Sequence, residues 1–281
     1  MRTRLAPVLL LLPGLAACGQ PVTVESTVER PYHGPMYIRP DFSDRATAQE
    51  RSGAAGRALE CEGEPYDGGG GDYVDGGLVS VQSDAREALE NHQDEAGLLD
   101  VPREGFVVER IDGDRVLFSY DVGERTKVAY IAADGIRDVG DDVGWGIEAW
   151  ASCDPAEFPA GVTDDLGIRV WHDRQGDRVP VSTITHYPGP EHCDWQDITF
   201  LSMGDGRTQY VGDRTGEFAD LLETTYDGDA VLPEDATDTG YEYDDWHLWL
   251  VADRSAAYVV DVDDRSEVER WPASNDTIAC A

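Results

Sequence analysis

The most regular hydrophobic pattern in this chain is a series of short apolar runs separated by turn residues. Residues 106–111 and 115–122 flank an Asp-Gly pair, which tolerates the positive φ angles of a tight turn, so the segment predicts a β-hairpin. A Gly-Glu turn then leads into residues 126–132, and residues 145–150 follow with two tryptophans. The pattern predicts four strands of an antiparallel meander.

A similar pattern returns near the end of the chain. Residues 246–252 and 256–261 are apolar runs on either side of an Asp-Arg-Ser turn, and residues 268–271 form a third run. Three further runs have the composition of strands that enter the two meanders: residues 36–38, 168–171 and 179–186.

Two segments have helical periodicity instead. Asp84, followed three residues later by Glu87, resembles a capping box. The apolar positions after it recur at helical spacing: Ala85, Ala88, Leu89, His92 and Ala96. A second helix is expected to begin at Thr215 or Gly216 and to carry its apolar residues on one side: Phe218, Leu221 and Leu222. Residues 67–77 hold six glycines and three aspartates, which predicts a mobile loop.

The cysteines and the strands repeat with a similar offset. Cys61 and Cys193 lie 132 positions apart, and Cys153 and Cys280 lie 127 apart. A shift of 131 also places residues 116–118 on 247–249. In each of the two regions, an acidic residue, one further residue and a tryptophan precede the second cysteine. These landmarks predict two diverged copies of one fold. The alternative is chance similarity within a single domain.

The duplication favours one of the three pairings that four cysteines allow, namely Cys61–Cys153 and Cys193–Cys280. Each disulfide would close a loop of about 90 residues, which the chain-entropy model values at roughly 4–5 kcal/mol. A zinc site is the alternative, but no Cys-x-x-Cys pair is present.

Taken together, these elements predict an α+β protein made of two diverged copies of an antiparallel sheet with one packed helix, each closed by a disulfide. The first copy is expected to span residues 34–158, and the second residues 159–281.

The first 17 residues have the parts of an export signal. Two arginines precede the apolar residues 5–12, and Leu15-Ala16-Ala17-Cys18 has the form of a lipobox. The apolar run is shorter than the roughly 20 residues that span a bilayer. We therefore expect cleavage before Cys18, lipid on its thiol, and residues 18–33 as a tether at the outer face of the membrane.

Charge restricts the partners. The chain has 22 Lys and Arg against 57 Asp and Glu, a formal charge of −35 that becomes −37 once the two arginines of the signal are lost. Such a surface repels phosphate backbones, so no nucleic acid is expected as a partner. Seven tryptophans, twelve tyrosines and 41% hydrophobic residues suffice for a packed core, so the acidity does not indicate disorder.

The sequence contains no motif of a serine hydrolase, a nucleotide-binding loop or a zinc protease. His186, Glu191 and His192 flank a Pro-Gly-Pro turn and could approach a metal, and residues 112–114 and 261–264 resemble incomplete calcium loops. Chance and solvated turns account for these better, so we expect no metal and no cofactor. Tryptophans at strand positions are expected to pack in the core rather than to line a sugar-binding face.

Several segments resemble those of a group of uncharacterised actinobacterial lipoproteins. They are the lipobox, His192-Cys193-Asp194-Trp195-Gln196, Asp245-Trp246-His247-Leu248-Trp249, Val268-Glu269-Arg270-Trp271-Pro272 before Cys280, and residues 115–122 and 144–153. The resemblance covers most of the chain from about Arg57 onward. It implies an envelope location and carries no known activity.

We therefore expect a non-catalytic binding or interaction protein of the cell envelope. Its partners would be the lipid bilayer, through Cys18, and an envelope ligand or protein. One alternative is a hydrolase of wall polymer or sugar, which needs two carboxyl groups about 5–10 Å apart across a Trp-lined cleft. Another is a regulator or inhibitor of a secreted enzyme, which needs an exposed apolar patch.

Detergent partitioning tests the anchor. Protein made in its own cells is expected to enter the detergent phase of Triton X-114, because each buried methylene of two acyl chains contributes about 0.8 kcal/mol. The Cys18→Ser variant should remain in the aqueous phase, whereas the tether variant Ser26→Ala should behave like the wild type. Wild-type protein in the aqueous phase would show that the lipid is absent.

Overall fold

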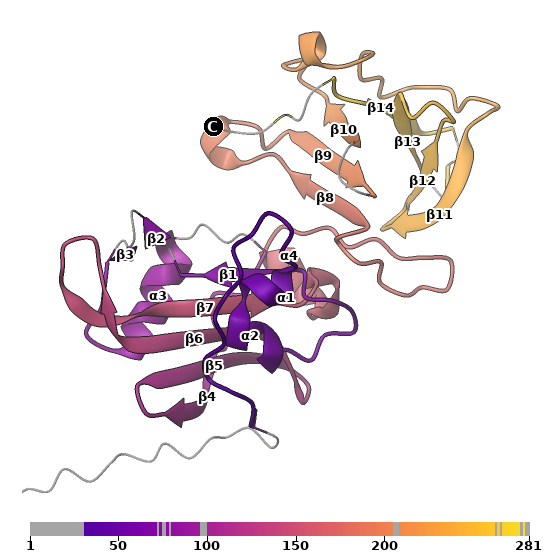
Figure 1. Ribbon diagram of the computed structural model, residues 1–281. Coiled ribbons are helices and arrows are strands. Elements are labelled where there is room, and N and C mark those ends of the chain that lie inside the picture. The colour runs from indigo at the N-terminus through magenta and orange to yellow at the C-terminus, as the bar shows by residue number, and fades with distance from the viewer. Residues whose placement is uncertain are drawn as a thin grey trace, which may run out of the picture.

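The computed structural model describes residues 31–71, 73–74, 77–78, 80–95, 100–204, 208–261, 263–264, 266–275 and 278. The export signal, Cys18 and Cys280 lie outside these ranges. The fold is α+β with mostly antiparallel sheets, as predicted, and its two halves lie one above the other (Figure 1). No helix of the described residues is long and apolar enough to cross a membrane.

The N-terminal half is built on a five-stranded antiparallel sheet in the order β1-β7-β6-β5-β4. Its strands are β1 (Asp67–Gly70), β4 (Val107–Asp112), β5 (Arg115–Val122), β6 (Arg125–Arg137) and β7 (Val143–Ser152). The predicted hairpin is confirmed, because Gly113 turns between β4 and β5 with φ +64°. The predicted meander is confirmed as well, with β6 and β7 longer than the apolar runs indicated.

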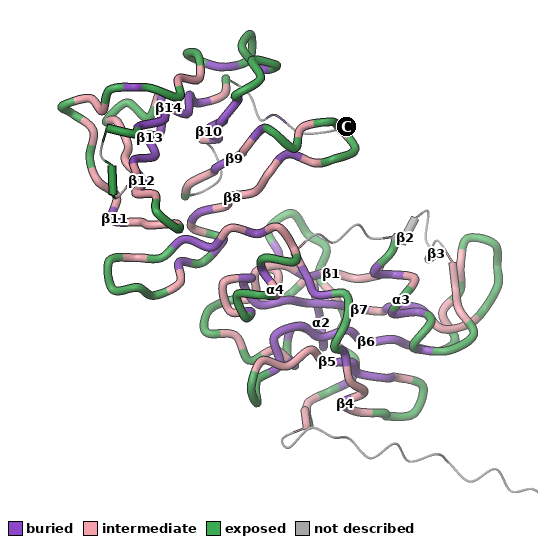
Figure 2. The backbone as a smooth tube through the Cα atoms, turned by 180° about the vertical axis from the view of Figure 1, so that it is seen from behind, coloured by how far each residue is buried: buried purple, intermediate pink, exposed green. Residues whose placement is uncertain are grey.

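Helices cover both faces of this sheet. Side chains point to alternate faces along a strand, and on β6 Tyr130 packs with Leu89 of α3 (Ala85–Glu95), whereas Ile131 packs with Ala55 of α2 (Gly53–Ala58). Thr126 to Ala133 are therefore buried without interruption (Figure 2). The helix at α3 was predicted. The short α1 (Ala48–Arg51) and α2 were missed, since α1 has one apolar residue and α2 consists mainly of glycine and alanine, so neither forms an apolar stripe.

Two expectations for this half were wrong. Residues 67–77 are not simply a loop, because β1 pairs with β7 and a small sheet forms from β2 (Tyr73–Val74) and β3 (Gly77–Leu78). Glycine is needed in β1 for close packing, since a Cβ on Gly68 would lie 2.0 Å from the Ser52 Oγ. Residues 36–38 form no strand, and Met36 instead packs over the sheet beside α2.

The C-terminal half consists of two antiparallel sheets, β8-β9-β10 and β11-β12-β13-β14. Their bounds are β8 (Ile184–Pro188), β9 (Ile198–Met203), β10 (Thr208–Asp213), β11 (Thr237–Tyr243), β12 (Trp246–Leu250), β13 (Ala256–Asp261) and β14 (Val268–Pro272). The second sheet confirms the three strands predicted on both sides of the Asp-Arg-Ser turn, which are β12, β13 and β14. Strands β9, β10 and β11 were not predicted.

Backbone hydrogen bonds join the two sheets on both sides. Beside β10 and β14, the Ser274 N–H donates to the Gln209 carbonyl at 2.8 Å. On the other side, the His172 N–H donates to the Glu242 carbonyl at 2.7 Å, and the Arg169 N–H to the His186 carbonyl at 3.1 Å. The sheets thus enclose one core, which includes Trp171, Leu201, Tyr210, Leu248 and Trp271.

The second predicted helix is wrong. Instead of a helix from Thr215 or Gly216, the segment has a single 3₁₀ turn, Ala219–Leu221. The carboxylate of Asp213 accepts hydrogen bonds from the N–H groups of Gly216 and Phe218, each at 2.8 Å, and this bonding organises the loop in place of helical bonds. The two halves therefore share a four-stranded meander but not a packed helix.

The two other predicted strands of this half need correction. Residues 168–171 make only isolated backbone contacts, and β8 begins at Ile184 rather than at residue 179. The short helix α4 (Ala160–Asp165) stands at the junction between the halves. Short apolar runs of this kind cannot be assigned to strand or buried loop by periodicity alone.

The structure contains the predicted Cys61–Cys153 disulfide, with 92 residues of sequence separation. It fastens the segment after α2 to the end of β7. Cys193 is disulfide-bonded too. Its predicted partner, Cys280, lies outside the described residues, so that pairing stays a prediction.

A buried carboxylate joins the two halves. Asp154, just after β7, is 8% exposed, and its oxygens accept from the N–H groups of Val181 at 2.8 Å, Ser182 at 3.0 Å and Ala156 at 2.9 Å. Arg178 adds hydrogen bonds to the Phe158 carbonyl at 2.7 Å and to the Thr163 hydroxyl at 3.1 Å. Hydrogen bonds donated by Arg178, Val181 and Ser182 therefore cross the junction to Asp154 and Phe158 of the N-terminal half.

Replacing Asp154 tests this junction. In Asp154→Ala the three N–H groups lose their acceptor, and an unsatisfied buried donor costs about 1–3 kcal/mol. We expect a clear loss in the free energy of unfolding, measured by urea titration of tryptophan fluorescence. The matched change Asp253→Ala, at an exposed turn where the carboxylate accepts from Ser255 N–H, should have a smaller effect. Equal losses would exclude a special role for Asp154.

Candidate functional site

A cavity of about 600 Å³ lies where the two halves meet. The N-terminal half contributes residues of β1, β7 and positions 100–101, the junction contributes positions 166–168, and the C-terminal half contributes β8 and the residues after it. Cavities of about 300–1,000 Å³ are typical of sites for small organic ligands, and they occur preferentially between domains. We take this cavity as the candidate functional site.

The walls of the cavity are mainly apolar. Trp150 on β7 stands with its ring stacked on Tyr130, at 6.2 Å between centroids, so the core of the N-terminal half fixes its position. Val101 and Ile168 continue the wall, and Pro188 and Pro190 close it from the C-terminal half. Apolar walls of this kind favour the burial of an apolar ligand surface.

One carboxyl group in the cavity has a perturbed acidity. Burial raises the pKa of Asp100, and the charges of Asp67 and Asp154 raise it further, against the opposing hydrogen bond from Tyr66. The Tyr66 hydroxyl donates to Asp100 Oδ2 at 3.4 Å. Burial, and then the charge of Asp100, also raise the pKa of Tyr66, so its hydroxyl remains a neutral donor. Burial and neighbouring negative charge therefore favour the neutral form of this carboxyl group over the ionised form.

The charge of Asp100 also affects a residue on the cavity wall that the C-terminal half contributes. The pKa of Tyr187 on β8 is raised mainly by burial, and the charge of Asp100 contributes to the shift. Asp67, on the near wall, accepts from the Gly68 N–H at 2.7 Å and lies 3.6 Å from Arg51. The lining of the cavity therefore includes Asp100 with its raised pKa, the hydrogen-bonded Asp67, and the aromatic residues Trp150 and Tyr187.

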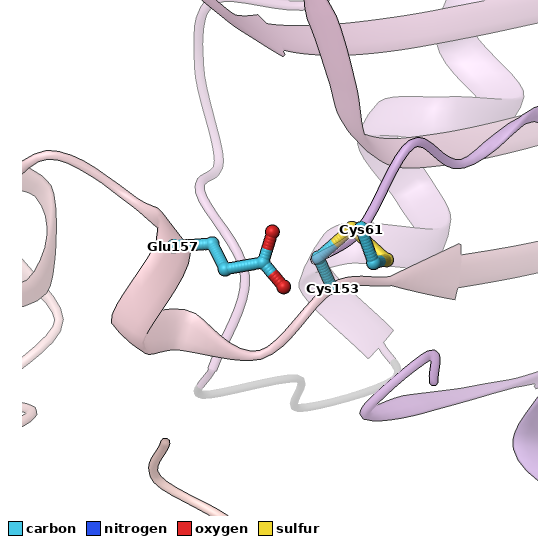
Figure 3. Close-up of side chains that lie close together, drawn as sticks. All are labelled: Cys61, Cys153 and Glu157. Atoms are coloured by element: carbon cyan, nitrogen blue, oxygen red, sulfur yellow. A yellow bond between two sulfur atoms is a disulfide. The ribbon is translucent and has the colours of Figure 1, made fainter. Parts of the chain in front are cut away.

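The predicted metal candidates are brought together only in part. His186 and Glu191 both border the cavity, and His192 does not. Among the described residues, the one group of three possible metal ligands within reach of one another is Cys61, Cys153 and Glu157 (Figure 3).

That group does not suit a metal ion. The two sulfurs are bonded to each other, whereas zinc is bound by free thiolates. The carboxylate of Glu157 accepts from the Lys127 ammonium and from the Glu62 N–H at 3.0 Å. Lys127, the only lysine of the chain, lies in β6 as predicted and is buried against this carboxylate.

In the two segments that resemble calcium loops, Asp261 and Asp112 bond to residues close to them in the chain. Asp261 Oδ1 accepts from the N–H groups of Asp263 and Asp264 at 2.8 Å each, and Asp112 pairs with the Arg110 guanidinium. An aspartate that accepts from the backbone two residues on is an ordinary turn former. These side chains are therefore engaged in the local fold.

Sequence reasoning missed Asp100, which borders the cavity, and Tyr66, whose hydroxyl donates to it. Tyr66 and Asp100 are 34 positions apart and belong to no motif. Trp150 was among the tryptophans considered, and it is both a core residue, as expected, and part of the cavity wall. Only the packing of residues 66 and 100 beside β7 reveals the site.

Comparisons with protein-family models, with curated proteins and with solved structures find no match to this chain. The fold and the site therefore have to be interpreted from the physical chemistry of the chain itself.

The acidity of Asp100 predicts a pH-dependent stability. Because its pKa is raised in the folded state, the unfolded state loses the proton first as pH rises from about 3.9. Asp100 therefore destabilises the fold increasingly up to its folded pKa and fully above it. Asp100→Asn should be more stable than the wild type in urea at pH 7, with the advantage lost below about pH 4.

The control for this prediction is Glu104→Gln, which removes one charge from an exposed position. It should not reproduce the gain at pH 7. If both substitutions stabilise the protein equally, the effect reflects the net charge of −35 rather than the buried site.

Proposed function

We propose that this protein is an extracytoplasmic lipoprotein that is anchored through Cys18 and binds a small ligand, without converting it, in the cavity between its halves. The observation that carries the proposal is the apolar cavity of about 600 Å³, which is bordered by Asp100, a carboxyl group whose pKa is raised. The lipobox supports the location, and the absence of a catalytic motif in the sequence supports binding rather than chemistry.

The chemistry of the walls defines the class of ligand. Asp67, Asp100 and Glu191 border the cavity, and none of its described lining residues is an arginine or a lysine. An anionic ligand would be repelled there. A ligand with an apolar body and an ammonium or hydroxyl group fits, since the body would contact Trp150 and the polar group would reach Asp100.

We propose in addition that the two meanders, β4–β7 and β11–β14, diverged from one duplicated unit. Both are consecutive four-stranded meanders in the same spatial order, and the shift of 131 that aligns residues 116–118 with 247–249 relates β5 to β12. In this scheme a disulfide between Cys193 and Cys280 closes the second copy as Cys61–Cys153 closes the first.

A carboxylate-dependent hydrolase of wall polymer or sugar is the second candidate. It is favoured by one observation, namely that Asp100, with its raised pKa, lies beside Asp67 on a wall that contains Trp150. A glycosidase needs one protonated acid and one ionised partner, and a raised pKa favours the protonated form. Asp67 is held by the Gly68 N–H and by Arg51, which suits a structural carboxylate better than a nucleophile. We therefore favour ligand binding over hydrolysis.

Filling the cavity tests the binding proposal. The neutral apolar dye N-phenyl-1-naphthylamine should bind the wild type saturably, with increased fluorescence. Thr185→Trp places a large ring into the cavity from β8 and should weaken binding by about tenfold or more. Thr237→Trp, on the exposed edge of β11, should bind the dye like the wild type. Unsaturable binding, or equal binding by both variants, would refute the proposal.

Asp100→Asn separates the two candidates. Nitrophenyl glycosides of N-acetylglucosamine serve as the substrate probe. The binding proposal expects no turnover by the wild type and retained dye binding by the variant. Turnover by the wild type that is abolished in Asp100→Asn would establish the hydrolase instead.

A further inference from the structure

A second, smaller cavity of about 180 Å³ opens at one end of the core between the two C-terminal sheets. Tyr243 and three tryptophans, Trp171, Trp246 and Trp271, contribute to its walls, and its polar groups are Arg169, His186, Arg214 and Glu269. Arg214 is exposed and Trp246 half-buried, so the cavity reaches the surface.

His186 lies between two hydrogen-bond donors. The Trp171 Nε1–H donates to His186 Nδ1 at 3.1 Å, and a guanidinium nitrogen of Arg169 lies 3.1 Å from His186 Nε2. Tryptophan and arginine side chains can only donate, and a neutral imidazole accepts at one nitrogen only. One of the two contacts must therefore place an N–H group opposite another N–H group.

The burial of the two donors decides which contact is satisfied. Trp171 is 1% exposed and His186 4%, so an unsatisfied indole N–H would be shut off from any other acceptor. Arg169 is only half-buried and borders the cavity. The imidazole proton therefore belongs on Nε2, where it faces Arg169 and the cavity. Burial, and then the charge of Arg169, lower the pKa of His186, which keeps the ring neutral.

The other charges of the cavity are already paired. Glu269 Oε1 accepts from Arg214 at 2.6 Å, and its Oε2 accepts from the Trp271 Nε1–H at 2.9 Å. Arg169, in contrast, forms no ion pair with a carboxylate in the described part of the chain, although the chain has 57 acidic residues. Asp164 and Asp244 act on the neighbouring Tyr243 at longer range, and neither is an ion-pair partner of Arg169.

We propose that this cavity is a binding site for a small oxyanion, a carboxylate or a phosphate. One oxygen of the anion accepts from both His186 Nε2–H and the Arg169 guanidinium, which satisfies the two donors that face each other. The volume is below the roughly 300 Å³ at which sites for drug-sized ligands begin, so the ligand is a small anion or the anionic end of a larger molecule.

Titration with single anions tests the proposal on the full chain. Sodium acetate and inorganic phosphate are added separately at constant ionic strength, and tryptophan fluorescence is followed because three tryptophans line the cavity. A saturable change with either anion is expected, and the anion that binds identifies the chemistry. Arg169→Gln should weaken binding by about tenfold or more. Arg137→Gln, an exposed arginine of the N-terminal half, should bind like the wild type.

A measurement on the wild type keeps the test independent of how well the variant folds. Long-range ¹H–¹⁵N spectra of the imidazole rings should show His186 as a neutral Nε2–H tautomer, and the anion that binds should shift its Nε2 resonance. No saturable response to either anion, or an Nδ1–H tautomer for His186, would overturn the proposal. Equal binding by Arg169→Gln and Arg137→Gln would overturn it as well.

Discussion

The structure depends on the buried carboxylate of Asp154. A carboxylate at 8% exposure is tolerated only because three backbone N–H groups donate to it, and these groups belong to both sides of the junction. The same residue follows Cys153 directly, so the disulfide and the carboxylate together fix the end of β7. The cavity between the halves has a defined shape because its opposite walls are connected through this point.

The two cavities have opposite chemistry in one strongly acidic chain. The larger one is bordered by carboxyl groups and lacks arginine and lysine among its described lining residues, which suits a cationic or hydroxylated ligand. The smaller one gathers two arginines and an imidazole within aromatic walls. His186 on β8 borders both, since β8 separates the core of the C-terminal half from the junction. The many acidic residues on the surface therefore do not determine the electrostatic potential inside either cavity. Burial and ion pairing of the lining residues determine it, because both act over short distances.

The elements that the sequence predicted correctly are those with local signals. The Asp-Gly hairpin, the meander after it, the capped helix α3 and the strands around Asp253 each carry a turn or cap within a few residues. The errors fall where local pattern and tertiary environment differ. Residues 215–222 have helical spacing, but Asp213 binds the backbone that a helix would use. Residues 67–70 are rich in glycine and still form a strand, because they pair with β7, and at Gly68 a Cβ would lie 2.7 Å from the Trp150 carbonyl oxygen.

The sequence by itself determined the α+β class and the cysteine pair that closes the N-terminal half, whereas the export signal with its lipobox stays a prediction. Turn chemistry, hydrophobic runs and cysteine spacing are properties of neighbouring or repeated positions and can be read along the chain. Only the tertiary structure decided the two sites. The raised pKa of Asp100 and the contacts of Arg169 and Trp171 with His186 arise from burial and from partners distant in the sequence, and such contacts exist only once the chain is folded.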